Sequence, residues 1–530
     1  MKVFYFSVFF VTLLCGCTTP SVAPMEPLRF SLFSRPFFVQ KNERVTFDFL
    51  FKEGIQGAED CSYRAVLMRP HQPYEKLLPH GVDTHFCFRV GEQERDGFYV
   101  ATGYILEKRN EKPLLRGIAK RSFLCGRIIA DFLHIPSLPD KATKEYLNGY
   151  LKQFKSLGGN LLIADSLVTS ERAFYPSNVC RSRVVPEHDF LLEVLEGCDR
   201  EGIAVLLSLP WDVSADLPHS TRLASLEKIM YELYLNYGAH PSFCGYYSHL
   251  TGGSLDYALY IRTFTKLVKS LDDGLLTACS PYLEDPLLAG YLASIEWLDI
   301  ILPQTRFSAS RLPSDGRFLP VRRAADYIKC FAGASSRKKL LLPRIELFSP
   351  SQETALSESD VKGQILAVSS VGNLNGIALY SYHRDVYPLL AAKGEKMEKA
   401  LQDALTAFNV IQSEFSSHPT IAIYYPSSGR LRSANSLFDS LDSLRRKGIS
   451  SGVVVFVPPS RESLSPFPPT MADEEMVRSL AESARVILLC DVVALSESDC
   501  SFINEALSSG ATLVVSGFPL PTGTCLLYTS

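Results

Sequence analysis

Two charged residues interrupt an apolar run near position 345. In the stretch "LLLPRIELF", Leu340 to Phe348, only Arg344 and Glu346 carry charge. Side chains alternate between the two faces of a strand, and one face here is wholly apolar: Leu341, Pro343, Ile345 and Leu347. The other face holds Leu340, Leu342, Arg344 and Glu346, so its polarity rises toward the C-terminal end.

A buried guanidinium beside a carboxylate keeps that carboxylate in its charged form. A charged Glu346 suits a nucleophile or a charge-stabilising base better than a proton donor. Three interpretations of this residue stay open. Glu346 is catalytic, or it lines a site without catalysis, or it belongs with Arg344 to a structural polar network that plugs a barrel.

The elements that must position Glu346 alternate between strand and helix. Strand patterns stand at 126–134, 158–168, 203–212, 243–250, 275–283, 298–305, 339–348 and 375–383. Amphipathic helical patterns separate them, and several end at a glycine, as a C-cap should. Eight βα units over about 290 residues predict a (β/α)8 TIM barrel at 126–416.

Polar and aromatic residues gather where these strands end. The active site of a TIM barrel lies at the C-terminal ends of its strands, and the side chains expected there are Asp131, Asp165, Trp211, Tyr247, His249, Gln304, Arg344, Glu346, Tyr382, His383 and Asp385. Aromatic rings stack on sugar rings, and carboxylates and amides bind hydroxyl groups. We therefore expect a carbohydrate-binding rim.

The chain is predicted to be multidomain, because 530 residues are too many for one core. Short period-two runs with turn signals predict an N-terminal antiparallel β-sandwich at 28–125. Four strand patterns with intervening helices predict a flavodoxin-like α/β domain at 417–530. No G-x-G-x-x-G or Walker loop follows any strand, so we expect no nucleotide and no other cofactor.

The N-terminus predicts a lipoprotein. An apolar run from Val3 to Leu14 is too short to span a bilayer and is typical of a signal peptide, here 1–17. "LCGC" resembles a lipobox, which implies lipidation at Cys17, with 18–27 as a Pro/Ser/Thr tether. The alternative is an ordinary secretory signal with a chance cysteine. The expected location is the cell envelope, lipid-anchored and extracytoplasmic, at the outer membrane or cell surface.

Charge and cysteine spacing limit the binding partners that we expect. The formal net charge is −3 with acids and bases mixed along the chain, so the basic face needed for phosphate-backbone binding is missing and nucleic acid is not an expected partner. The cysteines lack zinc spacing, so no metal site is expected. The tail "CLLYTS" resembles adapter read-through, and we expect the native chain to continue beyond residue 524.

The barrel motifs carry a family resemblance. "LKQFKSLGGNLLI", "HPSFCGYYSHL", "LDIILPQT" and "PRIELFSP" resemble an uncharacterised bacterial domain-of-unknown-function family of glycosidase-like TIM barrels. The resemblance covers roughly 126–415. It implies acid/base and nucleophile Glu residues after strands four and seven, and Glu346 falls at the nucleophile position.

The chain departs from that family at strand four. Tyr246 stands for the family's Trp, Thr251 lies near the expected acid, and Thr305 replaces a usual Asp. Because a glycosidase needs two carboxyl groups, His249, Asp165 or Asp385 would have to serve as the proton donor. The C-terminal region resembles the glutamine-amidotransferase-like domain of some β-galactosidases, which there is an oligomerisation element. That resemblance leaves a homo-oligomer open.

The sequence thus predicts a carbohydrate-active surface lipoprotein whose barrel acts on or binds an oligosaccharide or polysaccharide. The alternative is a non-catalytic glycan-binding or structural envelope lipoprotein with a degenerate site. The catalytic candidates are Glu346, His249 and Asp165. The substrate-binding candidates are Asp131, Trp211, Tyr247, Gln304, Arg344, Tyr382, His383 and Asp385.

Overall fold

A computed structural model of the chain forms the basis of the description. It describes residues 30–35, 43–51, 61–70, 75–77, 85–90, 92, 95–109, 112–137, 144–169, 173–180, 189–210, 219–253, 255–282, 287–305, 321–334, 339–349, 354–372, 374–389, 395–414, 421–424, 443, 446, 453–456, 486–490 and 497–516. The signal peptide and tether predicted at 1–27 lie outside these residues, as do Cys17 and Trp211.

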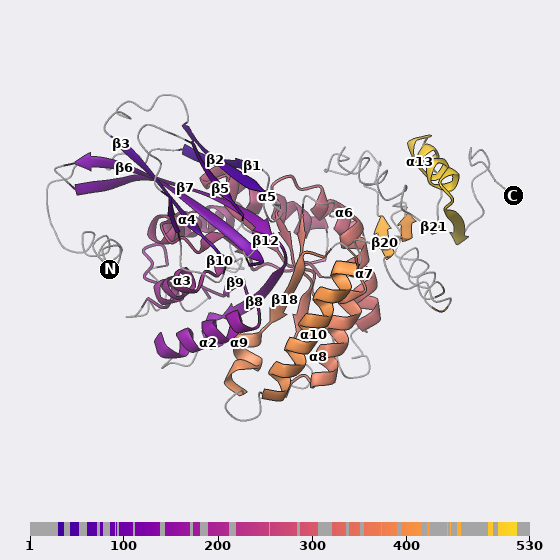
Figure 1. Ribbon diagram of the computed structural model, residues 1–530. Coiled ribbons are helices and arrows are strands. Elements are labelled where there is room, and N and C mark those ends of the chain that lie inside the picture. The colour runs from indigo at the N-terminus through magenta and orange to yellow at the C-terminus, as the bar shows by residue number, and fades with distance from the viewer. Residues whose placement is uncertain are drawn as a thin grey trace.

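The central element is a curled parallel sheet (Figure 1). Its strands are β8 (Ile128–His134), β9 (Leu161–Asp165), β10 (Ala204–Leu209), β11 (Phe243–Ser248), β12 (Leu276–Cys279), β13 (Ile300–Ile301), β14 (Leu340–Leu341), β15 (Arg344–Glu346) and β18 (Gly376–Tyr380). They pair in the order β14-β13-β12-β11-β10-β9-β8-β18-β15. The two ends of this order, β14 and β15, are consecutive pieces of one strand.

Pro343 explains why the seventh strand is divided. Proline has no N–H to donate to a neighbouring strand, so the ladder is interrupted at that residue. The amides on both sides still bond to the sixth strand, Leu342 N–H to Ile301 O at 2.9 Å and Arg344 N–H to Pro303 O at 2.9 Å. Because β14 pairs with β13 and β15 pairs with β18, the predicted eight-stranded, TIM-like barrel is confirmed.

Helices alternate with these strands around the outside. They are α2 (Lys144–Ser156), α3 (Phe190–Glu201), α4 (His219–Tyr237), α5 (Leu255–Leu271), α6 (Leu287–Ala293), α7 (Val321–Ala334), α8 (Glu358–Ser369) and α10 (Glu395–Glu414). A short helix α9 (Tyr382–Asp385) and the 3₁₀ turns Ile135–Ser137 and Tyr387–Leu389 supplement them, and β16 (Phe348–Ser349) pairs antiparallel with β17 (Thr354–Ala355).

The alternation predicted for strand seven is confirmed. Leu341, Ile345 and Leu347 pack in the apolar cluster shared with the helices. Leu340 and Leu342 pack in the cluster that fills the barrel interior. Arg344 and Glu346 follow the interior set, so both charges face the inside of the barrel near its C-terminal end.

Two antiparallel sheets precede the barrel. One contains β1 (Phe30–Arg35), β2 (Arg44–Phe51) and β5 (His85–Arg89), and the other contains β4 (Glu75–Leu77), β3 (Cys61–Met68), β6 (Gly97–Arg109) and β7 (Lys112–Cys125). Phe47 of the first sheet shares an apolar cluster with Tyr99 and Phe123 of the second. The strands fall within the predicted 28–125, and their assignment as a sandwich stays a prediction.

The second sheet also closes one end of the barrel. Met68, Phe98, Val100 and Leu124 belong to the same cluster as the interior barrel residues. Hydrogen bonds also join the sheet to the barrel. Lys120 of β7 donates its ammonium N–H to His240 O at 2.7 Å and its backbone N–H to Asp272 at 2.9 Å. The sheet therefore covers the N-terminal ends of the strands, which leaves the C-terminal ends for a site.

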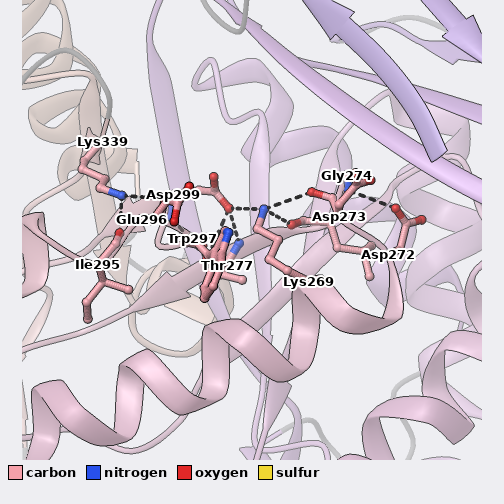
Figure 2. A network of polar contacts seen from close by, with 11 residues as sticks. Lys269, Asp272, Asp273, Gly274, Thr277, Ile295, Glu296, Trp297, Asp299 and Lys339 are labelled. Carbon is pink, nitrogen blue, oxygen red and sulfur yellow. Dashed lines mark hydrogen bonds and ion pairs between the residues drawn. The ribbon is translucent and has the colours of Figure 1, made fainter. Parts of the chain in front are cut away.

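A charged network reinforces the same N-terminal end (Figure 2). Lys269 donates to Leu275 O at 2.7 Å and to Asp299 at 2.9 Å, and Asp299 also accepts the backbone N–H of Thr277 at 2.9 Å. Lys339 donates to the backbone carbonyls of Ile295 and Glu296. Each of these charged side chains bonds to at least one backbone group, as expected of a structural network.

The C-terminal part forms a separate parallel sheet in the order β20 (Val453–Phe456), β19 (Ile421–Tyr424), β21 (Val486–Cys490), β22 (Thr512–Ser516), with α13 (Glu497–Ser508) preceding β22. Its class stays a prediction. None of the described helices is long and apolar enough to cross a membrane.

Candidate functional site

The C-terminal ends of the barrel strands bring several of the predicted residues together. We call this region the mouth and define it by the interior side chains His134, Asp165, Tyr247, Arg344, Glu346 and Tyr380 together with His249, Arg384 and Asp385 of the following loops. These groups share one electrostatic environment, because the charges of Asp165, His249, Arg384 and Asp385 all act on His134.

Glu346 forms an ion pair with Arg344 in the mouth. Arg344 Nε lies 3.0 Å from Glu346 Oε1, and the two side chains are 12% and 6% exposed. The guanidinium carbon lies 3.6 Å from the centroid of the Tyr380 ring and 5.8 Å from that of Phe132. Burial alone would lower the pKa of Arg344, but the negative charge of Glu346, aided by Tyr380, raises it, so the guanidinium stays charged.

A glutamine of the neighbouring helix holds the backbone of Glu346. Gln364 of α8 accepts the Glu346 N–H at 3.1 Å and donates to the Glu346 carbonyl at 2.9 Å. Thr305 adds to this clamp by donating to Arg344 O at 2.8 Å and to Gln364 Oε1 at 3.3 Å. Gln364 is buried, and sequence reasoning missed it. The available signal was a glutamine at an apolar position of the helical pattern Val361, Gln364, Ile365, Val368.

A second pair joins strands two and four. His249 Nδ1 lies 2.8 Å from Asp165 Oδ1, and the same oxygen accepts the Ser208 hydroxyl at 3.1 Å. Burial would raise the pKa of Asp165, but the hydrogen bond and charge of His249, followed by His134 and Ser208, lower it below its ordinary value. Since an ionised carboxylate only accepts, the proton sits on Nδ1, and Nε2 is the nitrogen that can exchange a proton.

The two members of this pair differ in their access to solvent. The Asp165 side chain is 4% exposed, whereas that of His249 is 46% exposed. A buried carboxylate that orients a half-exposed imidazole is the arrangement used by proton-transferring histidines. The mouth therefore contains one group able to move protons and one buried carboxylate–guanidinium pair.

A third ion pair lies beyond strand eight. Arg384 donates to both oxygens of Asp385, from Nε at 2.8 Å and from Nη2 at 3.0 Å. The Ser381 backbone N–H donates to the same carboxylate at 3.1 Å. Arg384 also stacks between Phe348 and Tyr380, with its guanidinium carbon 5.0 and 5.5 Å from their ring centroids. Sequence reasoning named Asp385 but missed Arg384, whose adjacent position to Asp385 was the signal.

Comparison with known proteins adds solved structures of similar shape. No family model matches the chain, and no curated protein matches it. A β-galactosidase from the psychrophilic Marinomonas ef1 gives a TM-score of 0.48 at 9% identity, covering 73% of this chain and 75% of that one. A polyextremophilic β-galactosidase from the Antarctic haloarchaeon Halorubrum lacusprofundi gives 0.47 at 9% identity, covering 73% and 72%.

The exo-β-1,4-mannosidase Op5Man5 from Opitutaceae bacterium strain TAV5 gives a TM-score of 0.43 at 12% identity, covering 71% of this chain and 80% of that one. All three TM-scores lie below 0.5. The barrel follows from the strand pairing, and the chemistry must follow from the mouth.

Three predicted site residues, Asp131, Tyr382 and His383, face the helices instead of the barrel interior. Asp131 is buried on the helix-facing side of β8, where it accepts the Tyr150 hydroxyl at 2.6 Å and the N–H groups of Tyr382 and His383 at 2.8 and 3.1 Å. The interior face of β8 instead carries Phe132. The physical reason is parity, since residues 128, 130, 132 and 134 point inward and 131 cannot.

Tyr382 and His383 follow Asp131 to the same side. They begin α9, and their buried rings pack against Tyr150 of α2 at 6.3 and 5.3 Å between centroids. Burial, reinforced by the charges of His134 and Arg384, lowers the pKa of His383 to about 4. Asp131, Tyr382 and His383 therefore join strand one to helix α2, and the structure does not bring them to the mouth.

Tyr247 and Gln304 face the interior but are buried. Tyr247 meets Phe132 edge to face at 5.4 Å. Gln304 donates to Ser280 O at 3.1 Å, which links strands five and six. Thr251, near the position where the family resemblance places an acid, donates its hydroxyl to Tyr282 at 2.6 Å. Tyr247 and Gln304 thus form the floor of the mouth.

Proposed function

We propose that the mouth binds an oligosaccharide and cleaves a glycosidic bond, with the Asp165–His249 pair moving the proton. The observation that carries this proposal is the 2.8 Å contact between a buried carboxylate and a half-exposed imidazole in the same mouth as Glu346. Glycosidic cleavage needs a proton donor to the leaving oxygen and a negative charge near the developing oxocarbenium ion. The mouth supplies a candidate for each.

His249 takes the place of the missing strand-four acid. It directly follows strand four, and Thr251 offers no carboxyl group. Asp165 holds the imidazole by Nδ1, so that protonated Nε2 would donate to the glycosidic oxygen and would then accept a proton from water. Asp385 is the weaker candidate for this role, because both of its oxygens already bind Arg384.

Glu346 would stabilise the positive charge on the sugar or attack its anomeric carbon. Its backbone is clamped by Gln364 on both sides, which fixes the carboxylate relative to the barrel. Such fixed placement is what electrostatic stabilisation of a transition state requires. Its ion pair with Arg344 supports the stabilising role more than the nucleophilic one.

A non-catalytic glycan-binding protein is the second candidate. Thr251 carries no carboxyl group and is engaged with Tyr282, so the arrangement implied by the family resemblance is incomplete. In that case the mouth would keep its sugar affinity, and turnover would be absent. The two candidates share the site and differ only in the proton step.

The experiment that separates them measures binding and turnover together. An oligosaccharide panel is screened by calorimetry and by product analysis with the wild type, Glu346→Gln and Gln412→Leu, the last changing a buried glutamine of α10. The enzyme candidate predicts turnover that falls by about 10²- to 10³-fold in Glu346→Gln and persists in Gln412→Leu. Binding without turnover in the wild type supports the second candidate, and no binding of any sugar rejects both.

We also propose the finer features indicated by the sequence. Cys17 would carry the lipid anchor at the cell envelope, supported by the lipobox-like "LCGC". The C-terminal sheet would be flavodoxin-like, supported by its parallel strand order 2-1-3-4, and the two N-terminal sheets would form a sandwich, supported by their shared apolar cluster. Mass spectrometry of the mature N-terminus tests the anchor, since an unmodified Cys17 would exclude it.

A further inference from the structure

We infer that the mouth selects an acidic sugar, whose carboxylate or sulfate group binds between the guanidinium groups of Arg344 and Arg384 beside Tyr380. The inference rests on the proposed function, since it specifies the class of sugar that the same mouth takes. It depends on three features: two arginines near one ring, unused donors on each, and carboxylates that already have partners.

The two guanidinium groups lie near the same aromatic ring. Their carbons are 3.6 and 5.5 Å from the centroid of Tyr380, which ends strand eight. Arg344 comes from strand seven and Arg384 from α9, so the seventh and eighth strands bring together residues forty positions apart. Both charges also act on the Tyr380 hydroxyl and lower its pKa, against the larger effect of burial.

Arg344 has unused hydrogen-bond donors, and its side chain is 12% exposed. A guanidinium offers five N–H groups, and only Nε bonds to Glu346. Among the residues that the structure describes, Nη1 and Nη2 of Arg344 make no hydrogen bond. These two groups can therefore receive an anion, because a guanidinium presents paired N–H donors to a carboxylate or sulfate.

Arg384 is held by neighbouring side chains and is partly exposed. Asp385 engages its Nε and Nη2, and its guanidinium carbon lies over the rings of Phe348 and Tyr380. Within the described part of the chain its Nη1 has no partner, and the side chain is 30% exposed. A guanidinium held by its neighbours binds an anion without losing further side-chain freedom.

The carboxylates of the mouth do not oppose an anion strongly. Glu346 is paired with Arg344, Asp385 with Arg384 and Asp165 with His249. An incoming carboxylate or sulfate therefore meets each negative charge beside a basic group. Guanidinium groups bind both anions by paired N–H donors, so uronate and sulfated sugars share the predicted chemistry.

The test compares glycans that differ only in charge. Uronate-containing oligosaccharides are compared by calorimetry with the same glycans after carboxyl reduction, and sulfated oligosaccharides with their desulfated forms. The inference predicts that at least one acidic form binds roughly ten- to a hundredfold more tightly than its neutral counterpart. The preference should weaken as sodium chloride is raised, because the contact is ionic.

Variants of Arg384 test whether this side chain causes the preference for acidic over neutral glycans. Arg384→Met should abolish the difference between acidic and neutral forms, and Arg384→Lys should keep part of it, because lysine keeps the charge and loses the planar fork. Arg200→Met, which changes an arginine of α3 outside the mouth, should leave the difference intact. Melting temperatures measured alongside show whether each variant is folded.

The possible results distinguish failure of the acidic-sugar inference from failure of the proposed function. Equal affinity for charged and neutral forms, or a preference that survives Arg384→Met, overturns the acidic-sugar inference and leaves the proposed function standing. Absence of binding to every glycan overturns the proposed function and this inference with it.

Discussion

The barrel has a histidine–aspartate pair at each end, and the two pairs have the same contact distance. At the mouth His249 Nδ1 lies 2.8 Å from Asp165, and at the N-terminal end His240 Nδ1 lies 2.8 Å from Asp199. At the mouth the side chains are 46% and 4% exposed, whereas the lower pair is evenly buried at 12% and 18%. Distance alone therefore does not distinguish a chemical pair from a structural one.

The partners of the two pairs do distinguish them. Asp199 also accepts the backbone N–H of Ser242 at 2.7 Å, and the carbonyl of His240 accepts from Lys120. At the mouth Asp165 instead accepts a second side chain, Ser208, and His249 presents half of its surface to solvent. The lower pair is thus bonded to the backbone of neighbouring segments, as are the lysines of Figure 2. The mouth pair instead bonds to a third side chain and exposes His249 to solvent.

The largest expected effect comes from changing each histidine to asparagine. The asparagine amide can still donate to the partner carboxylate but cannot transfer a proton at neutral pH. We expect His249→Asn to lower kcat by about 10²- to 10⁴-fold and His240→Asn to leave it unchanged, measured on an oligosaccharide found to be cleaved. Similar losses in both variants would erase the functional difference between the two ends.

Two buried glutamines allow a second comparison between the mouth and the rest of the barrel, with a smaller expected effect on turnover. Gln364 holds the backbone of Glu346, whereas Gln412 of α10 donates to Ser369 O and Val371 O. Gln412→Leu removes two hydrogen bonds and Gln364→Leu removes three, since Thr305 also donates to Gln364, and each change should cost about 2–4 kcal/mol of unfolding free energy. Only Gln364→Leu should also weaken turnover, by about tenfold to a hundredfold.

Urea unfolding and steady-state kinetics check this contrast. A Gln364→Leu protein with normal turnover would show that the clamp on Glu346 serves stability alone. Equal loss of turnover in Gln412→Leu would show that the effect is a general one on folding.

The smallest expected effect concerns two aspartates with opposite pKa shifts. Burial, despite hydrogen bonds from Tyr150, Tyr382 and His383, raises the pKa of Asp131 to about 7, whereas His249 and its neighbours bring that of Asp165 below its ordinary value. Asp131 binds its proton more tightly when folded, so its contribution to stability is complete below about pH 4 and is lost as the pH rises toward 7.

The contribution of Asp165 to stability depends on pH with the opposite sign. Its contribution is present above the unfolded pKa and is lost as the pH falls through the lower folded value. Asp131→Asn should therefore flatten the decline in unfolding free energy between about pH 4 and pH 7. Carbon-13 titration of both carboxyl groups provides the measurement, and an Asp131 that titrates near pH 4 would refute this assignment.

Much of the barrel could be predicted because its evidence is local. Each barrel strand pattern contains an observed strand, and the alternation in "LLLPRIELF" predicted which side chains face inward. The same alternation in "IIADFLH" turns Asp131 outward, so residue type without strand parity does not predict which carboxylates reach the mouth. Tyr382 and His383 lie outside the mouth because α9 begins immediately after strand eight and carries them toward α2.

The rest depends on contacts between distant segments. Gln364 acts on Glu346 from a helix eighteen residues later, and Asp165 meets His249 across eighty-four residues. The division of strand seven at Pro343 follows from the missing N–H of proline. The barrel closes, however, only because β14 pairs with β13 and β15 pairs with β18. Local patterns specify elements, and the side-chain pairs that perform chemistry arise only when those elements are brought together.

Nuclear magnetic resonance of the histidine Cε1–H groups tests the central claim most directly. Oligosaccharides from the binding panel are titrated into the full-length protein, with His240 as an internal reference at the opposite end of the barrel. Sugar binding at the mouth predicts a saturable shift of the His249 signal and none of the His240 signal. A glycan that binds and leaves His249 unchanged would contradict the assignment of the mouth as the carbohydrate site.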